Sequence, residues 1–229
     1  MSVVAELLVQ SFTDQVCYRL INSKYPPTSI FDDVADQDEF EAVFEVQKLT
    51  NPRLLNDVGL LNLVPPEKRP FGITGCNYAL GSFVHVNPAG SRFSKGAFGV
   101  FYAANKIETA IAETRYHQQK YFKKVVGLKF DRIVMRSLRA VFSADLINII
   151  EPLQTDKSWY KADDYSTSQE LGDAVKKDEL AGLWYGSVQD QYQPCFALFS
   201  PEFITEVIQL GHYEYIWDGQ KISHTLKVK

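Results

Sequence analysis

Residues 91–117, SRFSKGAFGVFYAANKIETAIAETRYH, constrain the fold more than any other part of the chain. The apolar run AFGVFYAA, residues 97–104, is short and bounded by turn residues, so it predicts a buried strand. Asn105 follows as a candidate helix N-cap, and Glu108 three residues later resembles the second half of a capping box. Apolar residues at helical spacing then predict a helix over 106–121. This stretch therefore predicts a turn, a buried strand and a helix in succession.

The other periodicities place strands and helices along the chain without a regular alternation of the two. A doubly wound parallel sheet would require such an alternation. We therefore expect an α+β fold with a mixed, largely antiparallel β-sheet core and flanking helices. The predicted strands are 16–25, 77–86, 124–135, 138–147, 182–188, 195–200 and 202–218, and the other predicted helices are 1–12, 36–49 and 166–179.

The length of 229 residues and the hydrophobic content of 45% suit one domain with a sizeable core. Residues 50–76 are rich in proline and glycine but too apolar to be disordered, so they predict a surface excursion rather than a linker. We therefore expect a single domain over 1–229. The net charge is −4, with acids and bases interspersed. A nucleic-acid-binding protein usually has a basic face, so we expect no direct nucleic-acid binding.

The cysteines indicate a reducing environment. Cys17, Cys76 and Cys195 are odd in number and far apart, which argues against a disulfide framework and a zinc ribbon. The first residues, MSVVAELLVQSF, lack the basic region of a signal peptide. No apolar run approaches the roughly 20 residues that span a bilayer. We expect a cytoplasmic protein without a membrane partner.

Several common catalytic motifs are absent from the sequence. It contains no GxGxxG, GxxxxGK[ST], HExxH or GxSxG. Its histidines, His85, His117, His212 and His224, do not have the spacing of metal ligands. We therefore expect no metal ion, no dinucleotide-binding fingerprint and no hydrolase nucleophile elbow.

Four polar residues stand in unusual contexts, and each has an ordinary structural alternative. Arg92 lies in a Gly/Ser-rich turn, where its planar guanidinium could bind phosphate or carboxylate, or could simply be exposed. Tyr102 lies within the apolar strand and could be a core tyrosine with a satisfied hydroxyl. Ser187 ends a predicted strand and could be a turn serine. Arg19 lies mid-strand between apolar neighbours, where a charge requires a buried partner or a ligand.

Glu113 lies beside the apolar stripe of the predicted helix, because it follows Ala110 by three residues. A carboxylate near a buried face requires a partner or a function. The alternative is a contact with His117 or Lys120 on a partly solvated face. The residues between 91 and 117 thus offer a cation, an aromatic hydroxyl and a carboxylate that could converge on one ligand.

Taken together, these residues resemble the RES domain family, which is named for an arginine, a glutamate and a serine. The matching segments are YRL at 18–20, the whole of 91–117, and STSQELGDAVKKDELAGLWYGSV at 166–188, followed by an apolar strand at 195–202. The resemblance covers most of 16–202. Its specific part is the middle segment, in which a tyrosine follows the arginine by ten residues and a TAIAE helix comes after it.

The resemblance implies a toxin of a bacterial toxin–antitoxin pair with a fold similar to ADP-ribosyltransferases and with NAD+ as substrate. It implies that Glu113, Tyr102 and Arg92 are catalytic and that Arg19, Arg92, Tyr102 and Ser187 bind NAD+. The implied partners are a cognate antitoxin and a host protein that accepts ADP-ribose.

Three functions remain open on the sequence alone. The first, which we favour, is transfer of ADP-ribose to a host protein. The second is degradation of NAD+ with water or phosphate as acceptor, and the third is a non-catalytic module that binds a nucleotide or a partner. The chain departs from a compact RES domain by a long insertion over 22–90. This insertion could serve as a lid, an acceptor-docking surface or an antitoxin contact.

Overall fold

The computed structural model describes residue 4 and residues 7–25, 28–51, 54–150 and 157–228. Within these residues one seven-stranded sheet has the order β1-β2-β5-β4-β3-β6-β7, and its only parallel pair is β3–β4. The strands are β1 (Val9–Asn22), β2 (Phe101–Ala104), β3 (Asp131–Asn148), β4 (Gly182–Gly186), β5 (Pro194–Leu198), β6 (Ile204–Trp217) and β7 (Ile222–Val228). The predicted α+β fold with a largely antiparallel sheet is therefore confirmed.

The sheet closes on itself through β1. This strand pairs with β3 from Val9 opposite Ile147 to Asn22 opposite Met135, and it also pairs with β2 where Tyr18 faces Ala104. Strands β1, β2, β5, β4 and β3 thus form a closed circuit of pairings, and β6 and β7 extend from the outer edge of β3. Strand β1 consequently lies beside β2, although the two are far apart in the chain.

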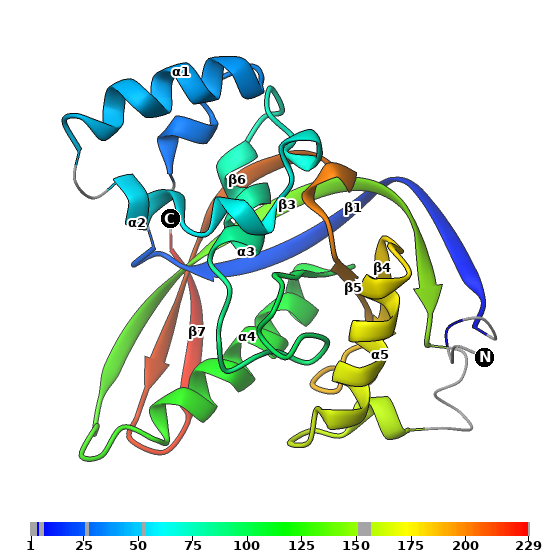
Figure 1. The fold of residues 1–229 in the computed structure, drawn as a ribbon. Coiled ribbons are helices and arrows are strands. Elements are labelled where there is room, and N and C mark those ends of the chain that lie inside the picture. The colour runs from blue at the N-terminus through cyan, green and yellow to red at the C-terminus, as the bar shows by residue number, and fades with distance from the viewer. Residues whose placement is uncertain (1–3, 5–6, 26–27, 52–53, 151–156, 229) are drawn as a thin grey trace.

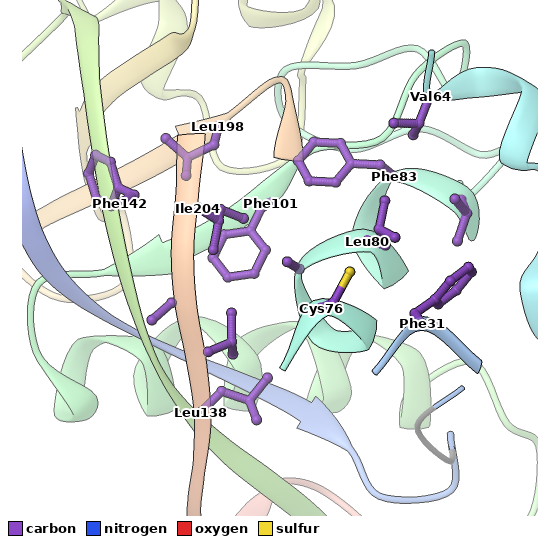
Figure 2. Packing of buried hydrophobic residues seen from close by; sticks show 14 of the residues in the cluster. Phe31, Val64, Cys76, Leu80, Phe83, Phe101, Leu138, Phe142, Leu198 and Ile204 are labelled. Atoms are coloured by element: carbon purple, nitrogen blue, oxygen red, sulfur yellow. The ribbon is translucent and has the colours of Figure 1, made fainter. Parts of the chain in front are cut away.

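The helices cover the sheet in two groups (Figure 1). Helices α1 (Gln37–Lys48), α2 (Leu54–Val58) and α3 (Cys76–Val84) lie together on one side, and α4 (Ile107–Phe122) and α5 (Ser166–Lys177) lie on the other. Each group has its own buried cluster against the strands. Figure 2 shows side chains of α3, among them Leu80 and Phe83, lying between sheet residues such as Phe101 and the side chain of Phe31.

The prediction of a strand over 77–86 is wrong, because these residues form most of α3. The buried apolar residues of α3 follow the helical period at positions 76, 79, 80, 83 and 84. The same short apolar run also alternates acceptably as a strand, so the pattern alone did not distinguish the two. Gly75 decides the start of the helix: its φ is 74°, and a Cβ there would lie 1.9 Å from the Val207 carbonyl oxygen.

Two other predictions are wrong in part, one of strands and one of a helix. The segments 124–135 and 138–147 belong to one continuous strand, β3, which begins only at Asp131, while 124–130 forms a turn and a loop. The predicted helix over 1–12 is contradicted where it overlaps β1, which begins at Val9; its residues 1–3 and 5–6 lie outside the described residues. Strand β7, which was not predicted, pairs with β6 at the sheet edge.

Strand β1, predicted over 16–25, overlaps that segment but spans Val9–Asn22, so its predicted start is wrong. The other elements agree with the prediction to within a few residues. Helix α4 begins at Ile107, but its N-cap residue is Lys106, which makes no capping side-chain bond, so the capping box of Asn105 and Glu108 does not form. Helices α1 and α5 and strands β2, β4, β5 and β6 occupy the predicted segments. The part of the insertion 22–90 that the structure describes shares a buried cluster with the sheet. The division into one domain with this embellishment stays a prediction.

Candidate functional site

A cavity of about 420 Å³ opens between β1, β2 and α4, beside the turn around Ser91. Four of the residues that the sequence singled out, Arg19, Arg92, Tyr102 and Glu113, line this cavity. These residues come together at the cavity because α4 closely follows β2 in the chain and because β1 pairs with β2. Three successive elements of the 91–117 segment thus contribute side chains to one space.

Tyr102 of β2 uses its hydroxyl to fix the adjacent turn. The hydroxyl oxygen lies 2.9 Å from Ser91 Oγ and accepts a hydrogen bond of 3.0 Å from the Phe93 backbone N–H. Burial raises the pKa of Tyr102 to about 12, so the phenol stays neutral. Its ring stacks on Phe93 at 6.2 Å and meets Tyr185 edge-on at 6.5 Å. The ring orientation is therefore fixed, which suits a surface for stacking.

Arg19 of β1 lines the cavity. Its Nη1 donates a 2.7 Å hydrogen bond to the backbone oxygen of Tyr102, and its guanidinium lies 4.9 Å from the centre of the Phe101 ring. Burial lowers the pKa of Arg19 from its ordinary value to about 10, which leaves it charged at neutral pH. Arg19 therefore keeps its positive charge beside the cavity, and in the described part of the chain this bond engages only one of its five N–H donors.

Arg92, in the turn before β2, also lines the cavity. Its Nη1 donates to the backbone oxygens of Trp159 at 3.3 Å and Lys161 at 3.1 Å, and its guanidinium stacks 4.7 Å from the centre of the Tyr165 ring. Within the described residues, neither Arg92 nor Arg19 forms an ion pair with a carboxylate. Two positive charges without a carboxylate partner favour an anionic ligand such as a pyrophosphate.

The carboxylate of Glu113, on α4, is oriented by a hydrogen bond from Ser187. The Ser187 hydroxyl donates a 2.5 Å hydrogen bond to Glu113 Oε1. Ser187 itself is fully buried, follows β4, and does not line the cavity. Glu113 Oε2 faces the other way and lies 3.8 Å from His117 Nε2. The serine therefore orients the carboxylate, while the second carboxylate oxygen remains available to a ligand.

The loop that carries Ser187 is tied to α4 at a second point. Thr109 Oγ1 donates a 2.6 Å hydrogen bond to Asp190 Oδ2, one helical turn before Glu113. Thr109 is fully buried. The Thr109–Asp190 and Glu113–Ser187 bonds therefore fix the loop after β4 against one side of the helix.

Sequence reasoning did not assign several residues that line the cavity. On α4, Ala110, Glu113, Thr114 and His117 all line it, at the i, i+3, i+4 and i+7 positions of one helical face. This spacing is a signal that could have placed His117 beside Glu113 in the cavity. Tyr165, Tyr185 and Cys195 also line it, but they come from distant segments whose approach is visible only in three dimensions.

Two further properties concern the described residues as a whole. No group of three or more His, Cys, Asp or Glu side chains among them is placed to hold a metal ion. None of the helices formed by these residues has both the length and the apolar character that crossing a membrane requires.

Comparisons with known proteins include a similar solved structure and a similar sequence. The structure is the M. tuberculosis MbcT–MbcA toxin–antitoxin complex, in which one chain matches at 10% identity with a TM-score of 0.43, covering 89% of this chain and 86% of that chain. The sequence is an uncharacterized protein, y4oC, of Sinorhizobium fredii (strain NBRC 101917 / NGR234). It is 27% identical over 213 residues, which cover 90% of this chain and 84% of y4oC.

The model of the RES domain matches residues 69–218. This range is more than half of the chain and contains Arg92, Tyr102, Glu113 and Ser187, whereas Arg19 lies before it. The match begins inside the segment 22–90, so residues 69–90 belong to the matched region as well. The chain therefore belongs to the RES domain family.

Proposed function

We propose that this protein is an NAD+-cleaving toxin of a toxin–antitoxin system, which breaks the nicotinamide–ribose bond and transfers ADP-ribose to a host protein. One observation carries the proposal: a carboxylate, oriented by a buried serine, shares a cavity with two arginines that lack a carboxylate partner among the described residues. Membership of the RES domain family supports the choice of NAD+ as the anionic ligand.

The ligand is oriented by charge and by stacking. The pyrophosphate lies between Arg19 and Arg92, because these groups supply the positive charge of the cavity. The nicotinamide ring stacks on the fixed ring of Tyr102, whose hydroxyl is already bonded to the Ser91 turn. This placement brings the nicotinamide ribose to Glu113.

The chemistry requires stabilisation of positive charge rather than a strong acid. Cleavage of the nicotinamide–ribose bond builds an oxocarbenium-like centre on the ribose, as in glycoside hydrolysis. Nicotinamide leaves as a neutral molecule. Glu113 accepts a hydrogen bond from the ribose 2′-hydroxyl, and this interaction strengthens as charge develops. Ser187 acts through Glu113, because its hydroxyl holds the carboxylate in place before the reaction begins.

The partners in this proposal are a cognate antitoxin and a host protein acceptor. Family membership is the reason for proposing an antitoxin. The alternative acceptors, water and phosphate, would make the protein an NAD+ glycohydrolase or phosphorylase and would use the same donor site. A non-catalytic module would bind NAD+ in this cavity without releasing nicotinamide.

One experiment separates these functions. The purified protein is incubated with cell extract and NAD+ that carries one label in nicotinamide and a second in the adenylate phosphate. Release of nicotinamide together with a labelled protein band is expected for transfer. Release without a labelled band indicates degradation of NAD+, and binding without release indicates the non-catalytic module. An extract treated with protease beforehand is the control for a protein acceptor.

A further inference from the structure

His117 is a titratable residue of the cavity that the proposed function does not use. It lies on the same face of α4 as Glu113, one turn further along, and its side chain is 53% exposed. Its ring meets the ring of Tyr116 edge-on at 5.3 Å. His117 therefore borders the cavity beside Glu113 and is also exposed to the solvent from which an acceptor arrives.

In the proposed reaction, no residue named so far receives the proton that an acceptor hydroxyl gives up. An acceptor hydroxyl that attacks the ribose must lose its proton, whereas an anionic nucleophile such as azide or a phosphate anion needs no base. Glu113 already accepts a hydrogen bond from Ser187 and is needed as an anion beside the oxocarbenium-like centre. A separate base is therefore required if the acceptor is a hydroxyl.

The geometry provides a place for such a hydroxyl. His117 Nε2 and Glu113 Oε2 are 3.8 Å apart, which is too long for a direct hydrogen bond. This separation is less than twice the length of a hydrogen bond of about 2.8 Å, so one oxygen atom can lie within bonding distance of both atoms. An oxygen at that position is next to the carboxylate that faces the ribose.

We propose that His117 is the general base that receives the proton of a hydroxyl acceptor, either water or a hydroxyl-bearing side chain of a host protein. The proposal rests on the proposed function of the site. In this step the acceptor oxygen forms a bond to the ribose C1′, and the bond from C1′ to the nicotinamide nitrogen breaks. Its electron pair stays on the nicotinamide, which becomes neutral. The acceptor proton moves to His117 Nε2 and later passes to solvent.

The surroundings of His117 favour the neutral imidazole that a base requires. Partial burial lowers the pKa of His117, and the positive charges of Arg92 and Lys120 lower it further, while Glu113 acts in the opposite direction. The charge of Lys120 is partly offset by Asp163 at 2.9 Å. Because the pKa is lowered, His117 is deprotonated at neutral pH and gains a proton only on acidification.

The test compares His117→Gln with the wild-type protein for two kinds of nucleophile. Nicotinamide release is measured with cell extract in phosphate-free buffer, and again with added azide. We expect the variant to lose about 10²–10⁴-fold of release to the hydroxyl acceptors and less than about tenfold of release to azide. The acid limb of the wild-type pH profile should disappear in the variant. His224→Gln, at an exposed position of β7, is the matched control.

Several results would overturn the proposal. Equal losses with both kinds of nucleophile would assign His117 to binding, and an unchanged rate or an unchanged pH profile would remove it from the reaction. A wild-type protein that releases nicotinamide only with inorganic phosphate would exclude a hydroxyl acceptor. If the wild-type protein releases no nicotinamide with any nucleophile, the proposed function itself fails. A second variant, His117→Asn, and the melting temperatures of both variants separate a loss of activity from a loss of folding.

Discussion

On one side of the sheet, helices α1–α3 cover aromatic rings that stack on one another; on the other side, α4 covers a cavity walled by guanidinium groups, hydroxyls and a carboxylate. In the first region Phe40 stacks on Phe31 at 5.7 Å and on Phe71 at 5.1 Å. In the second, Arg19, Arg92 and Tyr102 all make hydrogen bonds with backbone atoms. The two regions share the same strands but bury very different groups.

This difference separates what stabilises the protein from what equips it to bind a ligand. Burial of apolar side chains is the main favourable contribution to folding. Charged groups placed beside a cavity cost desolvation energy, which a bound ligand can recover. The aromatic region should therefore control the free energy of unfolding, and the cavity should control NAD+ turnover. Substitutions in the two regions test this separation.

The largest expected effect is on stability, in the aromatic region. Phe31 is 1% exposed, and Phe31→Ala should lower the free energy of unfolding by about 3–5 kcal/mol, because it removes buried area and leaves a cavity. Denaturant unfolding measures this loss, and Leu49→Ala at an exposed position of the same segment is the control, with a change within about 0.5 kcal/mol. If Phe31→Ala also lowered the specific activity per folded molecule, the proposed separation between stability and NAD+ turnover would be contradicted.

Next in size is the loss of turnover in Glu113→Gln. The substitution keeps the shape of the side chain but removes the charge beside the ribose, so nicotinamide release should fall by about 10²–10³-fold with the fold retained. Glu108→Gln, at an exposed position of the same helix, is the control. Release near the wild-type rate would contradict the assignment of Glu113.

Arg92→Ala should weaken NAD+ binding by about 10–100-fold, the value of one lost hydrogen bond to a charged group. The melting temperature should change little, because Arg92 bonds two backbone oxygens near the surface but has no carboxylate partner among the described residues. Calorimetric titration with NAD+ and a thermal melt test the two expectations together. A large drop in melting temperature with unchanged affinity would show that Arg92 belongs to the scaffold.

The smallest effect is expected for Tyr102→Phe, which tests the boundary between the two regions. The ring remains for stacking, but the bonds to Ser91 and to the Phe93 N–H are lost, so the free energy of unfolding should fall by about 1–2 kcal/mol. Turnover should fall much less than in Glu113→Gln. A loss of turnover as large as that of Glu113→Gln would mean that the hydroxyl takes part in the reaction. Tyr25→Phe, at an exposed position, is the control.

The sequence was most informative where neighbouring residues determine the outcome. The turn, strand and helix of 91–117 were predicted because a short apolar run and a helical stripe follow each other there. The convergence of Arg92, Tyr102 and Glu113 followed from this local order. The helical spacing also places His117 on the same face of the helix as Glu113. Spacing alone, however, does not show that this face borders a cavity.

The rest depended on contacts that local patterns do not encode. Strand β3 passes through residues 136–137 without a turn because β1 and β6 pair with it on its two edges, and neither partner is visible in the sequence of β3 itself. The short apolar run of α3 fits both the helical and the strand period, so the sequence alone also predicts a strand there. The bond between Thr109 and Asp190 joins residues 81 positions apart, which single-sequence reasoning could not pair.

The closed circuit of strands has a consequence for the time at which the cavity forms during synthesis. Arg19 is made well before its partner, because the backbone oxygen that it bonds belongs to a residue 83 positions later. Ser187, which orients Glu113, comes 74 positions after Glu113 in the chain. Such long-range pairings form late, because the chain between them must be ordered first. A nascent chain that has not yet exposed Ser187 from the ribosome therefore lacks an organised site, and we expect the protein to become active only after this serine has emerged.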